Sequence, residues 1–193
     1  MTTPERLARI KSVLGFRQPD LHVVLEQVGN PHNASAVLRT CDAAGIMNVD
    51  VIGSAADPLP INEAITTRAD KWLSIRFHDT TEACLSDLKR EGFTVAVTHL
   101  GPGAIPYTSL DYTRPTAVVF GGEKNGISAA ALAAADVGIK IPMFGMVQSL
   151  NLSVSVGIIV YEAIRQRLGK GLFDDPRLSP AELEDYLDRW SDL

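Results

Sequence analysis

Three segments of this chain combine glycine or proline with amide, hydroxyl and charged side chains. They are Pro31–Gly45, Val119–Ser128 and Ile139–Gly157. In the last segment an apolar run meets Pro142, which cannot donate to a strand ladder, and Gly145, which permits unusual φ values. A loop of this composition exposes main-chain N–H and C=O groups. It could therefore bind a small polar ligand through the main chain alone.

Polar side chains near the predicted helix starts have a structural explanation as well as a chemical one. Asn33 opens one helical pattern, and Ser149 and Asn151 precede another. Asparagine and serine are common N-caps, so capping is the simplest function for all three. The helix after Asn151 has an apolar face that predicts packing in the core or in a dimer interface. That face contains Leu152, Val156, Ile159, Val160 and Ala163.

The charged residues of these segments also allow two interpretations. Arg39 could form an i,i+3 ion pair with Asp42, or its guanidinium could bind a phosphate. Glu123 follows two glycines and precedes Lys124. It could form a weak surface ion pair or orient other groups in a site. The residues alone leave both alternatives open.

Length and composition favour a single globular domain. The chain has 193 residues, of which 46% are hydrophobic and 21% are charged, as is usual for soluble proteins. No apolar run approaches the roughly 18–20 residues of a membrane span, and none resembles a signal peptide. We therefore expect a cytoplasmic protein that has no membrane partner. Cys41 and Cys84 are isolated, and the four histidines are scattered, so no metal site is predicted.

The net charge of −5 argues at first against nucleic acid, whose phosphates require basic surface. Residues 171–193 alone carry a net charge of −5, which leaves a neutral body. Basic residues gather at the N-terminus and at the end of the last long apolar helix. We expect an RNA-binding surface there, made of Arg6, Arg9, Lys11, Arg17, Arg165 and Arg167, with His32 beside Asn33 as a further candidate.

Apolar runs alternate with helical patterns, which predicts an α/β fold with a mostly parallel sheet and helices on both faces. The predicted strands are His22–Val28, Val49–Gly53, Trp72–Phe77, Thr94–Leu100, Ala117–Gly121 and Val137–Ile141. The predicted helices are Pro4–Leu14, Asn33–Ala44, Thr81–Glu91, Ser128–Ala135, Leu150–Leu168 and Pro180–Trp190. The last begins with a capping box at Ser179, and its apolar stripe predicts that it docks on the body or on a second subunit.

The usual nucleotide-binding signatures are missing. The chain has no G-x-G-x-x-G after its first strand and no G-x-x-x-x-G-K-[ST], so neither a dinucleotide site nor a P-loop is indicated. The glycines of interest come late in the chain, at Gly121, Gly122, Gly126 and Gly145. In an open parallel sheet such loops lie at the carboxyl ends of the strands, where ligands bind.

Taken together, the three segments resemble the motifs of the SpoU/TrmH family of RNA 2′-O-ribose methyltransferases. Asn33 with Arg39 resembles the first motif and FGGEKNGIS with Glu123 the second, while IPMFGMVQSLNLSVS with Ser149 and Asn151 resembles the third. The match covers about residues 21–168, in the order and spacing of the family. Similarity around QSLNLSVS and YEAIRQR favours the branch of the family that acts on guanosine 18 of tRNA.

The resemblance implies a fold that periodicity does not reveal. It predicts one SPOUT-type methyltransferase domain over residues 1–193, with a deep trefoil knot near the C-terminus. Short helical extensions would cover about residues 1–20 and 170–193. It also implies a homodimer, in which Arg39 of one subunit serves the donor site of the other.

The resemblance further implies that the cofactor is S-adenosyl-L-methionine and that the substrate is the D-loop of tRNA. Methyl-donor contacts would come from Thr98, Leu100, Gly121, Gly122, Ile141, Met143, Ser149 and Leu150. The catalytic group would comprise Asn33, Arg39, Glu123, Ser149 and Asn151. Arginine stays protonated at ordinary pH. We therefore expect Arg39 to act as an electrostatic clamp on the ribose and phosphate and not as a base.

Two alternatives to this function stay open. The first is 2′-O-methylation of the tRNA wobble position or of ribosomal RNA. The second is a non-catalytic RNA-binding module of the same fold. A binding module would not need all five residues of the proposed catalytic group.

Overall fold

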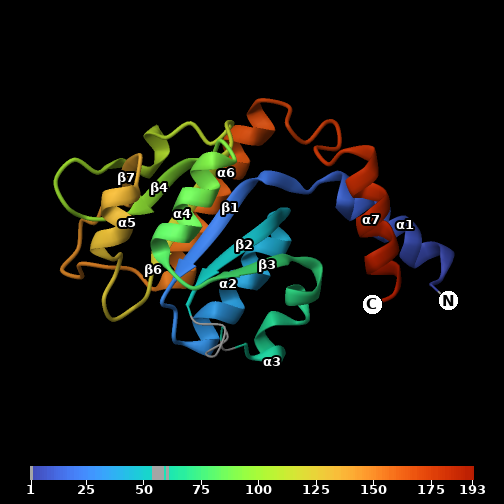
Figure 1. Cartoon of the computed structure of the whole chain (residues 1–193), viewed down its shortest axis with the longest axis horizontal. Helices are drawn as coiled ribbons and strands as arrows, with labels where there is room; N and C mark the ends of the chain where they lie inside the picture. Colours follow the sequence, from blue (N-terminus) through green and yellow to red (C-terminus); the bar gives the residue numbers. More distant parts are fainter. Residues whose placement is uncertain (1, 54–58, 60) are drawn as a thin grey trace.

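The described residues form one sheet of seven strands, in the order β3-β2-β1-β6-β4-β7-β5, and every strand pair is parallel (Figure 1). The computed structural model describes residues 2–53, 59 and 61–193. The predicted parallel α/β architecture is therefore confirmed. The strands are β1 (Gln18–Glu26), β2 (Ile46–Ile52), β3 (Ser74–His78), β4 (Thr94–Thr98), β5 (Ile105–Pro106), β6 (Thr116–Gly121) and β7 (Val137–Lys140).

Helices cover both faces of the sheet, as predicted (Figure 1). They are α1 (Pro4–Gly15), α2 (Pro31–Ala43), α3 (Glu63–Thr66), α4 (Thr81–Arg90), α5 (Ala129–Ala134), α6 (Leu152–Gly169) and α7 (Pro180–Ser191). Two short 3₁₀ turns, Ala69–Trp72 and Tyr107–Ser109, lie before β3 and after β5. The strand β5 and the helix α3 were not predicted, because segments of two and four residues are too short to show periodicity.

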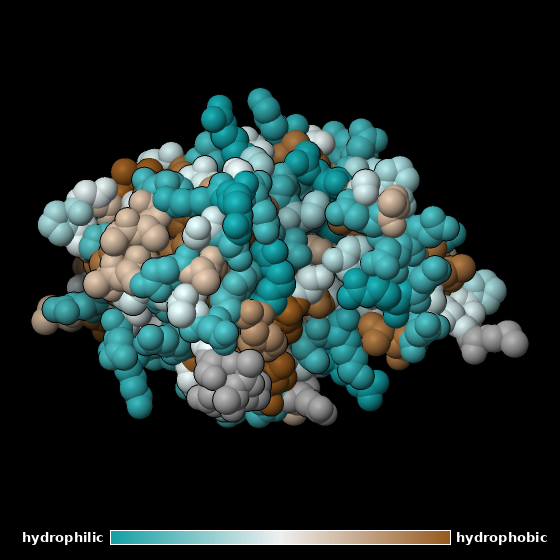
Figure 2. Space-filling view, viewed as in Figure 1, coloured by the Kyte–Doolittle hydropathy of each residue, from teal (hydrophilic) through white to brown (hydrophobic). Residues whose placement is uncertain are grey.

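The core consists of two apolar layers on opposite sides of the sheet. One layer packs α2 and α6 against the sheet and includes Val37, Leu38, Val156 and Ile159. The other packs α4 and α5 against it. Because both faces are covered, the central strands read as continuous apolar runs. In Figure 2 a light-brown, moderately hydrophobic area lies over the alanine-rich helix α5, with hydrophilic residues around it.

A row of polar side chains crosses β1, β2 and β3 near α4. The buried carboxylate of Asp50 accepts hydrogen bonds from Arg76 Nε at 2.9 Å and lies 2.7 Å from His22 Nδ1 and 2.8 Å from His78 Nε2. Burial alone would raise the pKa of Asp50, but the hydrogen bond and charge of His22, with His78 and Arg76, lower it to about 2. This network satisfies a carboxylate that would otherwise be costly to bury.

The same row contains metal-type donor atoms, because those of Asp50, His78 and Cys84 lie within 4.8 Å of one another. The guanidinium of Arg76 already supplies the positive charge beside Asp50. Burial also raises the pKa of the Cys84 thiol to about 12, which disfavours the thiolate that binds metals. We therefore interpret the row as a structural ion-pair network.

The terminal helices α1 and α7 pack together beside the sheet, near both ends of the chain (Figure 1). Ile10, Leu14, Met47 and Trp190 form a small core of their own, against which Leu183 and Leu187 also pack. The capping box at Ser179 is present. The prediction that the last helix docks is confirmed, and it docks on its own subunit with its carboxylates exposed.

Two arginines assigned to RNA binding from the sequence are instead buried in the protein. Arg17 is 0% exposed and donates to Asp42 at 2.5 Å and to the carbonyl of Ile46 at 2.9 Å. Its guanidinium lies over the Trp190 ring. Because it cannot reach a phosphate, its assignment to an RNA surface is wrong.

Arg167 is also 0% exposed. It donates to Asp20 at 2.6 Å, to Gln18 at 3.0 Å and to the carbonyl of Tyr112 at 2.9 Å. These bonds fasten the end of α6 to the start of β1. Arg167 therefore stabilises the fold and is not part of an RNA-binding surface, so this prediction is also wrong.

Candidate active site

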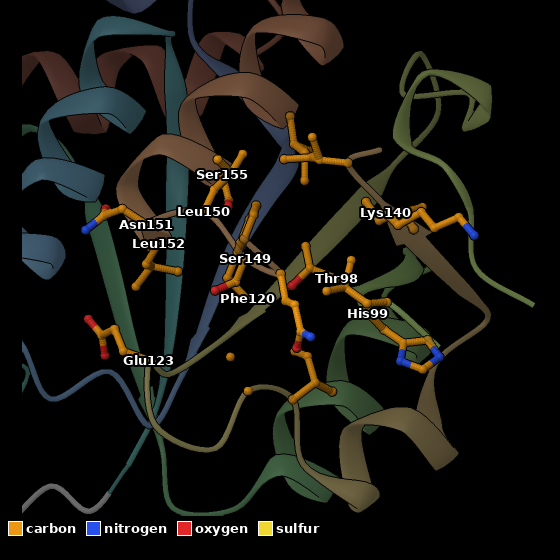
Figure 3. Close-up of a pocket in the computed structure, with 18 of the residues that line it drawn as sticks. Thr98, His99, Phe120, Glu123, Lys140, Ser149, Leu150, Asn151, Leu152 and Ser155 are labelled. Carbon is orange, nitrogen blue, oxygen red and sulfur yellow. The ribbon is translucent and has the colours of Figure 1, made fainter. Parts of the chain in front are cut away.

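A cavity of about 550 Å³ opens at the carboxyl ends of β4, β6 and β7, where the loop 141–150 leads into α6 (Figure 3). In a parallel sheet the carboxyl ends of neighbouring strands meet at one edge, and ligands bind there. Apolar side chains from β6, β7 and α6 form part of the wall, among them Phe120, Ile139 and Leu152. The rest of the wall is polar and includes Glu123 and Asn151.

Every residue predicted to contact a methyl donor lines this cavity. These residues are Thr98, Leu100, Gly121, Gly122, Ile141, Met143, Ser149 and Leu150. The Thr98 hydroxyl already donates to the carbonyl of Val119 at 3.1 Å. A wall of apolar side chains and main-chain groups suits a ligand that has both an aromatic ring and polar ends.

A tight glycine turn after β6 shapes the edge of the cavity. A Cβ at Gly121 would lie 2.1 Å from the carbonyl carbon of Gly126, and one at Gly122 would lie 2.2 Å from the Gln27 carbonyl oxygen. Gly126 has a φ of 63°, and its N–H donates to the Gly122 carbonyl at 2.9 Å. The turn requires glycine at these positions, and it presents Glu123 at the rim of the cavity.

A chain of hydrogen bonds joins the three sequence motifs. Asn33 Nδ2 donates to Glu123 Oε1 at 2.5 Å, and Asn151 Nδ2 donates to Asn33 Oδ1 at 3.0 Å. Glu123 lies 90 positions and Asn151 lies 118 positions after Asn33 in the sequence. The Asn33 and Asn151 side-chain amides each donate through Nδ2 and accept through Oδ1, so only one orientation of each amide makes both hydrogen bonds. The contacts therefore fix the positions of all three side chains.

The helix caps differ in part from the sequence prediction. Asn151 is the N-cap of α6, as predicted, and accepts from the Ser153 N–H at 2.8 Å. Asn33 is not the cap of α2, because Asn30 takes that position and accepts from the His32 N–H at 2.9 Å. The signal for this cap was Asn30 followed by Pro31 at the first helical position. Because Asn33 does not cap the helix, its side chain can donate to Glu123.

The two remaining predicted catalytic residues, Ser149 and Arg39, form no side-chain hydrogen bond or ion pair within the described part of the chain. Ser149 is exposed at the cavity and is not a cap. Arg39 is exposed on α2, and it forms no hydrogen bond or ion pair with any residue that the structure describes. Asp42 pairs with Arg17 instead, so the alternative of an Arg39–Asp42 pair is wrong. His32 is exposed at the start of α2.

Several cavity residues were missed by sequence reasoning. His99, Lys140, Gln148 and Ser155 also line the cavity. Gln148 lies inside the third motif, where its position beside Ser149 was an available signal. His99, Lys140 and Ser155 carry no local signal, because only the meeting of β4, β7 and α6 brings them to one place.

A second cavity of about 510 Å³ adjoins the first at Gly122 and Glu123. Its other walls come from the loop after β1 and from the glycine turn. They are formed by Gln27, Gly29, Asn30, Pro31, Lys124 and Asn125.

Comparisons with known proteins agree with the arrangement of these motifs. Residues 20–161 match the model of the SpoU rRNA methylase family. The chain belongs to the SpoU methylase family. It is 48% identical over 188 residues to the tRNA (guanosine(18)-2′-O)-methyltransferase of Thermus thermophilus, covering 97% of this chain and 96% of that one.

Solved structures of SpoU methylases have the same fold. The A. aeolicus TrmH/SpoU tRNA modifying enzyme superimposes with a TM-score of 0.93 at 41% identity, covering 97% of this chain and 95% of that one. An AdoMet-bound rRNA methyltransferase from Sinorhizobium meliloti superimposes with a TM-score of 0.66 at 29% identity, covering 80% of this chain and 59% of that one.

The exposed arginines and the lysine predicted to bind RNA are not among the residues that line the three cavities. Arg6, Arg9 and Lys11 are exposed on α1, and Arg165 is exposed on α6, where it pairs with Glu162 at 2.7 Å. Among residues 2–53, 59 and 61–193, no helix combines the length and hydrophobicity of a membrane span.

Proposed function

We propose that this protein transfers a methyl group from S-adenosyl-L-methionine to the 2′-oxygen of guanosine 18 in the D-loop of tRNA. The observation that carries the proposal is the hydrogen-bonded chain Glu123–Asn33–Asn151 at the rim of the donor cavity. A protein that only bound RNA would not need this chain next to a cofactor-sized cavity. Each of the three family motifs contributes one residue to these hydrogen bonds.

The first cavity has the volume and chemistry that the methyl donor requires. Its volume of about 550 Å³ lies in the usual range for small-molecule sites. Leu100, Ile141 and Leu150 provide apolar surface for an adenine ring, and the loop main chain provides polar groups. The bound donor supplies a methyl group on a positively charged sulfur. The AdoMet-bound relative supports this choice of cofactor.

The protein's own residues act mainly by positioning. Methyl transfer requires the acceptor oxygen to be in line with the donor, and an aligned geometry removes much of the entropic barrier. Glu123, Asn33 and Asn151 hold one another in a single arrangement. Arg39 is exposed and unpaired among the described residues. We assign it to the substrate phosphate and ribose, where its charge lowers the pKa of the 2′-hydroxyl.

The choice of guanosine 18 is supported by the relative from T. thermophilus, which matches nearly the whole chain. Methylation of another tRNA ribose or of ribosomal RNA is the alternative within the family. The test is to methylate tRNA transcripts with the purified protein and map the modified ribose by mass spectrometry. Methylation at guanosine 18 is expected, and a different modified nucleotide would contradict the proposed site.

The protein would work as a homodimer. Val154, Tyr161 and Leu168 lie one heptad apart on α6, and their exposed fractions are 48%, 53% and 59%. Phe144 and Met146 in the preceding loop are 97% and 100% exposed. So much apolar surface is unusual on a monomer. A second copy on this face would cover it and would bring Arg39 of one subunit to the site of the other.

We further propose that residues 1–193 form one SPOUT domain, in which α1 and α7 are extensions. The segment leading into α6 would thread through an earlier loop as the deep trefoil knot of the family. The protein would act in the cytoplasm and without a metal ion. Titration of the donor in the presence of a chelator tests the last point, and binding that disappears on chelation would contradict it.

A further inference from the structure

The second cavity adjoins the proposed donor cavity on the side of Glu123. It shares Gly122 and Glu123 with the donor cavity. A third cavity shares Leu100, Ile141 and Met143 with the donor cavity and so adjoins its other side. Under the proposed function, the acceptor ribose lies beside the hydrogen-bonded side chains of Glu123, Asn33 and Asn151. The base attached to that ribose therefore has the second cavity as its nearest enclosed space.

The walls of the second cavity are held in place by the main chain. Gln27 has a φ of 54°, which is unusual for a residue other than glycine. Its N–H donates to the Ile52 carbonyl at 3.2 Å, and its own carbonyl lies against Gly122, where a Cβ would come within 2.2 Å. The loop after β1 and the turn after β6 thus fix each other. Strained, tightly fixed backbone of this kind occurs often at binding sites.

The side chains facing the cavity have unused hydrogen-bonding groups. Lys124, Gln27 and Asn125 are exposed, and their side chains form no hydrogen bond or ion pair with the described residues. Lys124 is the one cation among the described residues that line this cavity. The lining therefore combines an ammonium group, which only donates, with amides that both donate and accept.

These groups match guanine better than the other bases. Guanine presents two acceptors, O6 and N7, on one edge, and lysine is a common partner for them. Adenine places an amino group beside N7, which an ammonium would repel. An amide can pair with the Watson–Crick edge of an unstacked base, as in the recognition of single-stranded RNA. The side-chain oxygen of Gln27 can accept from the 2-amino group of guanine while Lys124 donates to O6.

We propose that the second cavity holds the base of the methylated nucleotide and that Lys124 and Gln27 are residues that determine specificity for guanine. This inference rests on the proposed function. It adds a base subsite to it, because the hydrogen-bonded chain at Glu123 can position a ribose but cannot distinguish one base from another.

The test compares initial rates of methylation for the wild type, Lys124→Met and Gln27→Ala on tRNA transcripts. The transcripts carry guanosine, inosine or adenosine at the target position. Loss of one base contact of this kind should lower kcat/KM for guanosine by about 5- to 150-fold. Lys124→Met should bring the rates for guanosine and adenosine closer together. Gln27→Ala should do so for guanosine and inosine, since inosine lacks the amino group.

Lys71→Met is the matched control, because Lys71 is an exposed lysine outside all three cavities. Donor binding, measured by calorimetry on each variant, should equal that of the wild type. A Lys124→Met protein that loses the same factor on every base would identify a phosphate contact and overturn the inference, as would wild-type rates. If the wild type methylates no guanosine, the proposed function itself fails, which is a separate outcome.

Discussion

At the scale of single residues, burial separates the arginines that the sequence singles out. Arg39 is exposed and unpaired within the described chain, whereas Arg17 and Arg167 are buried and fully engaged. Arg39 and Arg167 lie within predicted helices, and Arg17 lies between a predicted helix and a predicted strand. No local pattern shows which of the three is buried. Burial decides which guanidinium can meet a phosphate.

Replacing Arg39 with Ala should leave donor binding nearly unchanged and lower methyl transfer by about 100-fold or more, because the lost charge acts on the ribose and phosphate. Arg39→Lys should also be poorly active if the fork geometry matters. Rates and donor affinities would be measured beside Arg114→Ala, an exposed arginine that lines none of the three cavities. Near-normal turnover of Arg39→Ala would refute the assignment.

Protonation of Asp50 in acid should lower the free energy of unfolding of the protein. Its pKa is lowered from 3.8 to about 2 in the folded state, so the ionised carboxylate stabilises the fold above pH 4 or so. That contribution, about 2 kcal/mol, should be lost as the pH falls from about 4 to about 2. Urea unfolding of the wild type and Asp50→Asn at several pH values measures it.

Asp50→Asn should lower the free energy of unfolding at neutral pH by about 3 kcal/mol, since Arg76 and the two histidines lose their shared carboxylate. Its stability should then fall less steeply in acid than that of the wild type. If the free energy of unfolding falls equally steeply with acid in both proteins, Asp50 is not the group that causes the loss of stability.

At the scale of elements, the C-terminal helix is an integral part of the fold despite its acidic composition. Trp190 is 4% exposed and packs edge-on against Trp72, with ring centroids 5.1 Å apart. It also covers the buried guanidinium of Arg17. The amphipathic stripe and the cap at Ser179 predicted docking correctly, because a solvated tail requires neither.

Deleting residues 179–193 should therefore lower the melting temperature. Trp190→Ala should have the same effect through a single side chain, at a cost of about 3–5 kcal/mol. Leu193→Ala is the matched control, because Leu193 is 52% exposed. Calorimetric melting of the three variants measures the effect. An unchanged melting temperature for the truncated protein would mean that α7 is dispensable for stability.

At the scale of the whole molecule, acidic and basic side chains are exposed on neighbouring elements. The carboxylates of α7 face solvent, while Arg6, Arg9 and Lys11 are exposed on the neighbouring α1. Because Arg17 and Arg167 are buried, the arginines and lysine left in the predicted RNA-binding surface are Arg6, Arg9 and Lys11 on α1 and Arg165 on α6.

Neutralising Arg6, Arg9 and Lys11 together should weaken tRNA binding and lower the slope of log K against log salt by about two to three units, because fewer counterions are released. Donor binding should not change. The control neutralises Lys71, Lys89 and Arg90, which lie on other elements. Binding measured across a salt series gives the slope, and an equal slope in both triple variants would place the RNA surface elsewhere.

The sequence by itself determined the class of fold, the six longer strands and the three motifs, because these features are local. Continuous apolar runs mark strands covered on both faces, and glycines mark turns that admit no Cβ. The eight residues that the family resemblance implies as donor contacts all line the first cavity, and their role as donor contacts stays a prediction.

Only the tertiary structure decided which polar residues act together. Asn33 reads as a cap in sequence, yet Asn30 takes that position and Asn33 bonds to Glu123 and Asn151. The second cavity likewise exists only because the loop at Gln27 contacts the turn at Gly122. Contacts between segments so far apart in the chain follow from strand order, and no local pattern encodes strand order.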